Sequence, residues 1–86
     1  MNDIKNKVIY IDYCINAFAD KYDLSPKQAY AYLYRFKGLD FLDECYEAEH
    51  QLSIRDAVAD LTEVCKNNGG KLKWFYIMAQ IWISVI

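Results

Sequence analysis

The first 22 residues carry an apolar pattern that an α-helix brings onto one face. Apolar side chains recur there at spacings of 4, 3, 4, 3 and 4 positions, at Ile4, Val8, Ile11, Ile15, Phe18 and Tyr22. This spacing follows the helical period of about 3.6 residues, whereas a strand alternates about every two residues. We therefore predict a helix that ends near Asp23.

The next segment has the signals of a helix start and a helix end. Ser25 suits the N-cap position, Pro26 suits the first helical position, and Gln28 completes a capping box. The predicted helix continues to about Lys37. Gly38 is expected to close it in the left-handed backbone conformation.

Two further helices are predicted between residues 40 and 68. Asp40 is expected to cap a short helix that runs to about Glu49 with its carboxylates in solvent. Ser53 is expected to cap a longer helix that ends at the Asn-Asn-Gly-Gly sequence of residues 67–70. The apolar positions expected to be buried are Phe41, Leu42, Cys45 and Tyr46 in the first helix, and Ile54, Ala57, Val58, Leu61, Val64 and Cys65 in the second.

The C-terminal segment differs in composition from the rest of the chain. Twelve of the 16 residues at positions 71–86 are apolar, and both tryptophans lie there. The segment is too short to span a bilayer comfortably, which takes roughly 20 apolar residues. We predict an all-α fold, a small bundle of four helices over residues 1–70 plus an apolar C-terminal segment over residues 71–86. A fifth helix is favoured there, with a strand or a membrane-associated segment as alternatives.

Charge is unevenly distributed along a chain whose net charge is -2. Residues 39–66 hold eight acidic and two basic residues, a local balance of -6, so the remainder sums to +4. The total gives no general attraction to phosphate backbones. An acidic face of this kind is either solvated or meets a basic partner.

Cysteine and histidine do not have the spacing of a metal or catalytic site. Cys14, Cys45 and Cys65 are separated by 31 and 20 positions, whereas structural zinc ligands come in close pairs. They cannot all pair within one chain, and no signal peptide is recognisable, so we expect a cytoplasmic protein with reduced thiols. His50 lies five positions after Cys45 without an orienting third group, and we expect it to cap the third helix or to pack beside Tyr46.

The acidic residues of the third predicted helix are read as ordinary surface carboxylates. Glu44, Glu47 and Glu49 lie on a helix that we expect to be exposed, and without a pocket their pKa values have no reason to shift. No constellation brings a nucleophile, a base and a pocket together. We therefore expect no enzyme activity, no catalytic residue, no cofactor and no metal.

The tyrosines point to protein binding, and the alternative is that a small domain uses these amphipathic rings to complete its core. The chain has eight tyrosines, and Tyr30, Tyr32 and Tyr34 cannot all face one core because alternate helical residues diverge by about 200°. Tyrosine and tryptophan are enriched at protein interfaces. The candidate partner-binding residues are Tyr30, Tyr34, Glu44, Glu47, Trp74 and Trp82.

Other kinds of partner stay open as alternatives. A helix-turn-helix-like DNA-binding regulator would use the helix after Ser53 for recognition, but that helix presents Asp56, Asp60 and Glu63 to the phosphates. A membrane-associated small protein would use Lys71 and Lys73 ahead of the apolar run. A homo-oligomer formed through the C-terminal segment is the third alternative.

A set of apolar, glycine and capping positions is spread over residues 8–70: Leu24-Ser25-Pro26-Lys27-Gln28-Ala29-Tyr30, Tyr32-Leu33, Gly38, Phe41-Leu42, Tyr46, His50, Leu52-Ser53 and residues 58–61. This pattern resembles a family of short bacterial proteins catalogued as domain of unknown function 3791. The resemblance implies a stand-alone helical protein with an accessory or antitoxin-like role, whose partner is a toxin-like ADP-ribosyltransferase encoded nearby. It transfers no catalytic residue, and the chain departs from the family pattern after Gly70.

Overall fold

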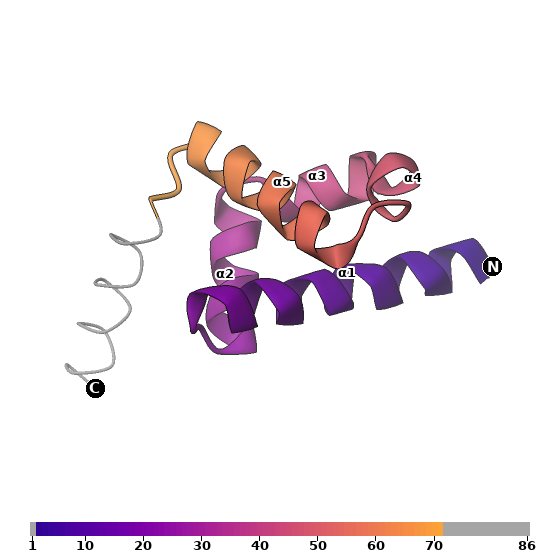
Figure 1. The fold of residues 1–86 in the computed structure, drawn as a ribbon, viewed down its shortest axis with the longest axis horizontal. Coiled ribbons are helices and arrows are strands. Elements are labelled where there is room, and N and C mark those ends of the chain that lie inside the picture. Colours follow the sequence, from indigo (N-terminus) through magenta and orange to yellow (C-terminus); the bar gives the residue numbers. More distant parts are fainter. Residues whose placement is uncertain (1, 72–86) are drawn as a thin grey trace.

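A computed structural model describes residues 2–71 of the chain, and this part is all-α, as predicted. The long first helix lies along one side of the domain, and α2, α3 and α5 pack against it (Figure 1). The described helices are α1 (Asn2–Tyr22), α2 (Pro26–Arg35), α3 (Gly38–Glu44), α4 (Tyr46–Glu49) and α5 (Ile54–Asn67).

The core lies where the C-terminal half of α1 meets α2, α3 and α5. The Phe18 ring of α1 stacks on the Tyr32 ring of α2 with 5.5 Å between ring centroids, and Tyr32 in turn contacts Phe36 at 5.0 Å. Because these rings and their aliphatic neighbours leave water together, they supply most of the apolar burial of a small domain. The largest fully buried side chains are Tyr32, Phe18, Leu33, Leu42, Leu61, Cys14 and Cys65.

The apolar stripe of α1 is covered only in its C-terminal half. Ile15 and Phe18 are buried, whereas Ile4 and Val8 of the same stripe are 71% and 61% exposed. The reason is visible in Figure 1, where α2 and α5 lie over the C-terminal half of α1 and the N-terminal turns continue past them. Helical periodicity thus identified the face correctly, and the neighbouring helices decide how much of it is buried.

Local capping signals place the starts of α2 and α5. The Ser25 hydroxyl accepts a 3.1 Å hydrogen bond from the Gln28 backbone N–H, and the Gln28 side chain accepts a 2.9 Å bond from the Ser25 N–H. This confirms the predicted capping box. The Ser53 hydroxyl likewise accepts the Asp56 N–H at 3.1 Å. The Ser25 and Ser53 hydroxyls thus satisfy N–H donors that a helix leaves free in its first turn.

The end of α5 is also as predicted. Gly69 adopts a left-handed conformation with φ 90°, and the Gly70 N–H donates a 2.8 Å hydrogen bond back to the Cys65 carbonyl. The Gly69 N–H donates to the Lys66 carbonyl at 3.1 Å. The two bonds together form a Schellman motif, which terminates helices with a left-handed residue.

The predicted roles of Gly38 and Asp40 are wrong. Lys37, with φ 72°, takes the left-handed position and precedes α3, and Gly38 is the first helical residue. Asp40 therefore lies inside the first turn of α3 and is not its N-cap. Gly38 serves close packing, because a Cβ atom there would lie 2.8 Å from Leu33 Cδ2 and 3.0 Å from Cys65 Sγ.

The single helix predicted from residue 40 to residue 49 is also wrong. Cys45 has φ -106° and ψ 19°, and it separates α3 from the four-residue helix α4. The break changes the direction of the chain and brings Glu49 into the interior, where 6% of it is exposed. The expectation that all carboxylates of this segment face solvent fails at Glu49.

The predictions for the apolar C-terminal segment concern residues outside the described range, apart from Lys71. Trp74 and Trp82 are among them. Within residues 2–71, no helix combines the length and the apolar character needed to cross a bilayer.

Candidate functional site

Two of the predicted partner-binding residues form a ring pair on the outer face of α2. Tyr30 and Tyr34 are 52% and 69% exposed, and their rings stack with 6.2 Å between centroids and 18° between planes. They are four positions apart, so they lie on one helix face. Tyr32 points to the opposite side and is buried, which agrees with the expectation that the three tyrosines diverge.

A depression beside this ring pair carries positive charge. It is lined by Tyr34, Arg35, Lys37 and Asp40. The Lys37 ammonium and the Asp40 carboxylate are 3.9 Å apart and both are exposed, so their attraction is weak. The ring pair therefore has cationic neighbours. The position of Lys37 among them could not be predicted from the sequence, because Lys37 reaches the site through the turn after α2.

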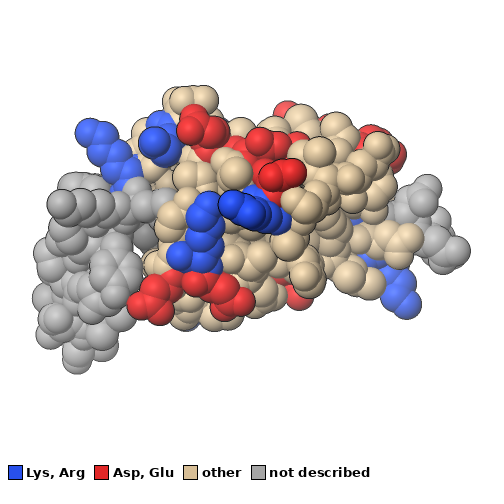
Figure 2. All heavy atoms as spheres, viewed as in Figure 1, with Lys and Arg blue, Asp and Glu red and all other residues tan. Residues whose placement is uncertain are grey.

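The predicted acidic residues belong to other elements than the tyrosines. Glu44 ends α3, Glu47 lies in α4, and both are exposed as expected. On the face drawn in Figure 2, acidic and basic side chains are interspersed, so this face has no field of a single sign.

The N-terminal part of α1 has exposed apolar side chains that were not among the predicted partner-binding residues. Ile9 and Tyr13 are more than half exposed, as are Ile4 and Val8. Ile9 and Tyr13 are four positions apart and lie outside the buried stripe. This second apolar spacing is the sequence signal that could have identified them. Helical geometry places Ile4 with Val8 on one face and Ile9 with Tyr13 on another, so the four side chains do not form a single apolar patch.

A second cluster lies where α1, α4 and α5 meet, and in it Glu49 is buried, Tyr10, Tyr46 and Asp60 are half-buried and His50 is exposed. The Tyr10 ring lies edge-on to Tyr46 and to His50, with centroid distances of 5.5 and 6.4 Å. The Glu49 carboxyl lies near that of Asp60. Burial, together with Asp60, raises the pKa of Glu49 to about 7. A carboxyl group with such a pKa holds its proton close to neutral pH.

The thiols near the core are shifted in the same direction. Burial raises the pKa of Cys14, an effect that the Tyr10 side chain partly opposes and the charge of Glu49 adds to. Burial also raises the pKa of Cys65 to about 11. Since the thiolate is the reactive form, both side chains have the character of structural cysteines rather than nucleophiles.

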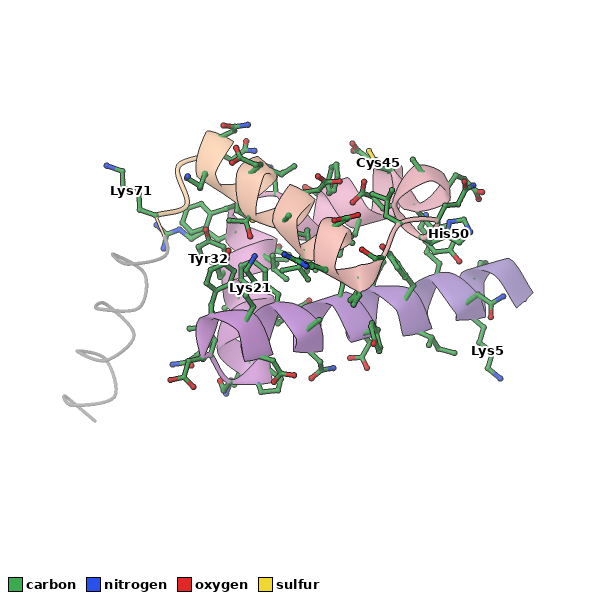
Figure 3. All side chains as sticks on the ribbon, in the orientation of Figure 1. Lys5, Lys21, Tyr32, Cys45, His50 and Lys71 are labelled. Carbon is green, nitrogen blue, oxygen red and sulfur yellow. The ribbon has the colours of Figure 1, made fainter. Side chains whose placement is uncertain are left out.

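His50 has the structural role expected of it. One ring nitrogen, Nδ1, is 2.7 Å from the Tyr46 carbonyl oxygen, and the ring stacks on Tyr46 with 4.5 Å between centroids. The side chains of Cys45 and His50 point in different directions (Figure 3). Within residues 2–71, no three His, Cys, Asp or Glu side chains are grouped so that they could hold a metal ion.

The face of α5 considered for DNA recognition is partly occupied by internal contacts. The Thr62 hydroxyl is 2.8 Å from the Tyr22 hydroxyl and donates to the Val58 carbonyl at 2.9 Å. Asp60 interacts with Glu49. Arg55, Asp56 and Glu63 remain exposed on this helix.

Comparisons with known proteins assign residues 10–68 to one family. Its model is described as protein of unknown function (DUF3791), and the match covers all of the described fold except the first turns of α1 and the residues after α5. Neither the curated proteins nor the solved structures contain a match to this chain.

Proposed function

We propose that this chain, which belongs to the DUF3791 family of proteins of unknown function, acts as a noncatalytic module that binds another protein. The observation that carries the proposal is the stacked and exposed pair of Tyr30 and Tyr34 on α2. Two rings held against each other lose little conformational freedom when a partner covers them. Tyrosine is accordingly among the residues that contribute most to binding at interfaces.

The surroundings of the ring pair support a partner with acidic and apolar side chains. Arg35 and Lys37 lie beside Tyr34 and would attract carboxylates, while the rings offer apolar area. Glu44 and Glu47 are separate charged positions on α3 and α4 that would contribute through longer-range attraction to a basic part of the partner. The Cys14 and Cys65 thiols are fully buried and Glu49 is 6% exposed, so these groups are not accessible to a substrate, and this favours binding over catalysis.

The specific form that we propose is an accessory or antitoxin-like regulator of a protein encoded nearby. This part rests on the family resemblance, which implies a toxin-like ADP-ribosyltransferase as the partner. Its test begins with affinity purification of the tagged chain from its native host and identification of the protein that co-purifies. The dissociation constant of the purified pair is then measured.

Variants of the ring pair test the surface itself. Replacing both Tyr30 and Tyr34 by Ala should weaken binding by about 30-fold or more, because hot-spot side chains contribute about 2 kcal/mol or more. Arg55→Ala, exposed on α5, is the control and should change affinity less than about threefold. Binding that withstands loss of both rings would refute this surface.

Charge reversal tests the acidic positions separately. Glu44→Lys and Glu47→Lys should slow association, with a larger effect at low salt than at high salt. Asp20→Lys, an exposed position on α1, makes the same change in net charge at another place. If the Asp20 variant is as impaired as the other two, net charge rather than a local surface governs the encounter.

A further inference from the structure

We infer that Glu49 and Asp60 form a proton-dependent latch, in which one shared proton holds the short helix α4 against α1 and α5. The inference concerns the interior of the domain and is independent of which protein binds at the tyrosines. It rests on the burial of Glu49, its carboxyl neighbour, and the small number of contacts that hold α4 in place.

Glu49 has the surroundings of a carboxylic acid rather than a carboxylate. It is 6% exposed, and its Oε1 atom has no hydrogen-bond partner among the described residues. Within residues 2–71, no lysine, arginine or histidine forms an ion pair with Glu49 or with Asp60. The nearby Lys7 pairs with Asp43 at 2.6 Å. A buried carboxylate without a cation is costly, so a proton is the group that neutralises this site.

The titratable groups around Glu49 do not supply the missing positive charge. From α1 it faces Tyr10 and Cys14, and from α5 it faces Asp60. In the segment that carries Glu49, the Tyr46 and His50 rings stack on each other and lie against Tyr10. The Lys7 ammonium lies 5.8 Å from the Tyr46 ring centroid. Two adjacent carboxyl groups in this setting cannot both ionise without repulsion.

The element that the proton holds is short and bounded by breaks. Helix α4 has four residues and begins after Cys45, where the backbone leaves the helical conformation. It ends in a turn closed by a 3.0 Å hydrogen bond from the Leu52 N–H to the Glu49 carbonyl. In this segment the Tyr46 and His50 rings contact Tyr10 of α1, and the Glu49 side chain is buried. Such a segment can open while the core of α1, α2 and α5 stays folded.

Loss of the proton would therefore open residues 45–52. Above the pKa of Glu49, about 7, the two carboxylates repel each other and the buried one gains by reaching water. The opened segment would uncover Tyr10 and Cys14, which lie beneath it on α1. Acidification would restore the shared proton and close the segment again.

The test uses the full chain and two readouts between pH 5.5 and 8.5. Carbon-13 NMR of the side-chain carboxyl groups should show Glu49 titrating near pH 7, well above the other glutamates. Hydrogen exchange, corrected for intrinsic rates, should show the opening equilibrium of residues 46–52 rising roughly 30-fold over this range, while exchange at Leu61 in α5 stays constant.

Three variants separate the latch from general pH effects. Glu49→Gln should abolish the pH dependence of residues 46–52, whereas Glu47→Gln, an exposed neighbour on the same helix, should keep it. Asp60→Asn should lower the NMR midpoint of Glu49, and it serves as the second test if Glu49→Gln folds poorly. Titration of Glu49 near 4.5, pH-independent exchange of residues 46–52, or opening of α5 together with them would each overturn the latch.

Discussion

The Tyr32 hydroxyl donates a 2.6 Å hydrogen bond to the carbonyl oxygen of Gly70, a residue 38 positions later in the chain. The bond joins the buried face of α2 to the turn that ends α5. Gly70 in turn donates its N–H to the Cys65 carbonyl at 2.8 Å. The end of α5 is thus fixed by a local helix cap and by a tertiary contact at the same residue.

Gly70→Ala should destabilise the domain by about 1–3 kcal/mol, because an added methyl group overpacks this junction. A Cβ atom at Gly70 would lie 2.8 Å from the Cys65 carbonyl oxygen, from Phe36 Cγ and from the Tyr32 hydroxyl. Urea denaturation followed by circular dichroism measures the change. The control is Gly69→Ala, where a Cβ atom meets nothing within 4 Å and only the left-handed backbone costs about 1 kcal/mol. A larger loss at Gly69 than at Gly70 would contradict the crowding explanation.

Lys37→Gly and Gly38→Ala should shift stability in opposite directions. Lys37 holds the left-handed conformation, so glycine there should stabilise the fold by up to about 1 kcal/mol. Alanine at Gly38 would press on Leu33 and Cys65 and should cost about 1–3 kcal/mol. Thermal unfolding of the two single variants checks both signs. Destabilisation by Lys37→Gly would show that the lysine side chain contributes more than the backbone strain costs.

Stability should fall as pH rises through neutrality, and Glu49 should account for the change. The fold raises the pKa of Glu49 from 4.5 to about 7, so the folded state binds this proton more tightly than the unfolded state. Its contribution is fully present below pH 4.5 and is lost as pH rises through about 7. Between pH 5.5 and 8 the loss should be about 2 kcal/mol.

Urea denaturation of the wild type and of Glu49→Gln at both pH values isolates this contribution. Other ionisable groups change with pH in both proteins, so the difference between the two pH dependences reports on Glu49. Equal pH dependence in the two proteins would mean that Glu49 titrates with an ordinary pKa.

The three thiols should differ in reactivity in the folded protein. Cys14 and Cys65 are buried, whereas Cys45 is partly exposed at the junction of α3 and α4. The raised pKa of Cys65, about 11, lowers its thiolate population at pH 8 by about 100-fold. Iodoacetamide followed by peptide mass spectrometry should therefore find Cys45 modified first. In urea the three rates should converge, and a difference that persists there would point away from burial as its cause.

The starts of α2 and α5 and the end of α5 could be predicted because they depend on contacts a few residues apart. Ser25 and Ser53 accept bonds from residues three positions ahead, and Gly69 provides the left-handed residue that terminates α5. The placement of Lys37 and Gly38 could not be read in the same way. Gly38 is needed because Leu33 and Cys65 lie close to it, and Cys65 belongs to a distant segment.

The residues of the candidate sites also differ in whether the sequence could predict their positions. The divergence of Tyr30, Tyr32 and Tyr34 follows from helical geometry alone, so the exposure of Tyr30 and Tyr34 could be anticipated once α2 was recognised. Glu49 was placed on the surface because a continuous helix would have carried it there. The break at Cys45 reorients it, and nothing in the local sequence announces that break.

The sequence by itself therefore determined the helical class, the apolar face of α1 and the capped helix ends, since these arise from periodicity and from neighbours along the chain. Only the tertiary structure decided that Ile4 and Val8 stay exposed and that Glu49 is buried beside Asp60. The physical reason is that burial and pKa depend on which distant segments cover a side chain, and the spacing of residues does not specify where those segments cross.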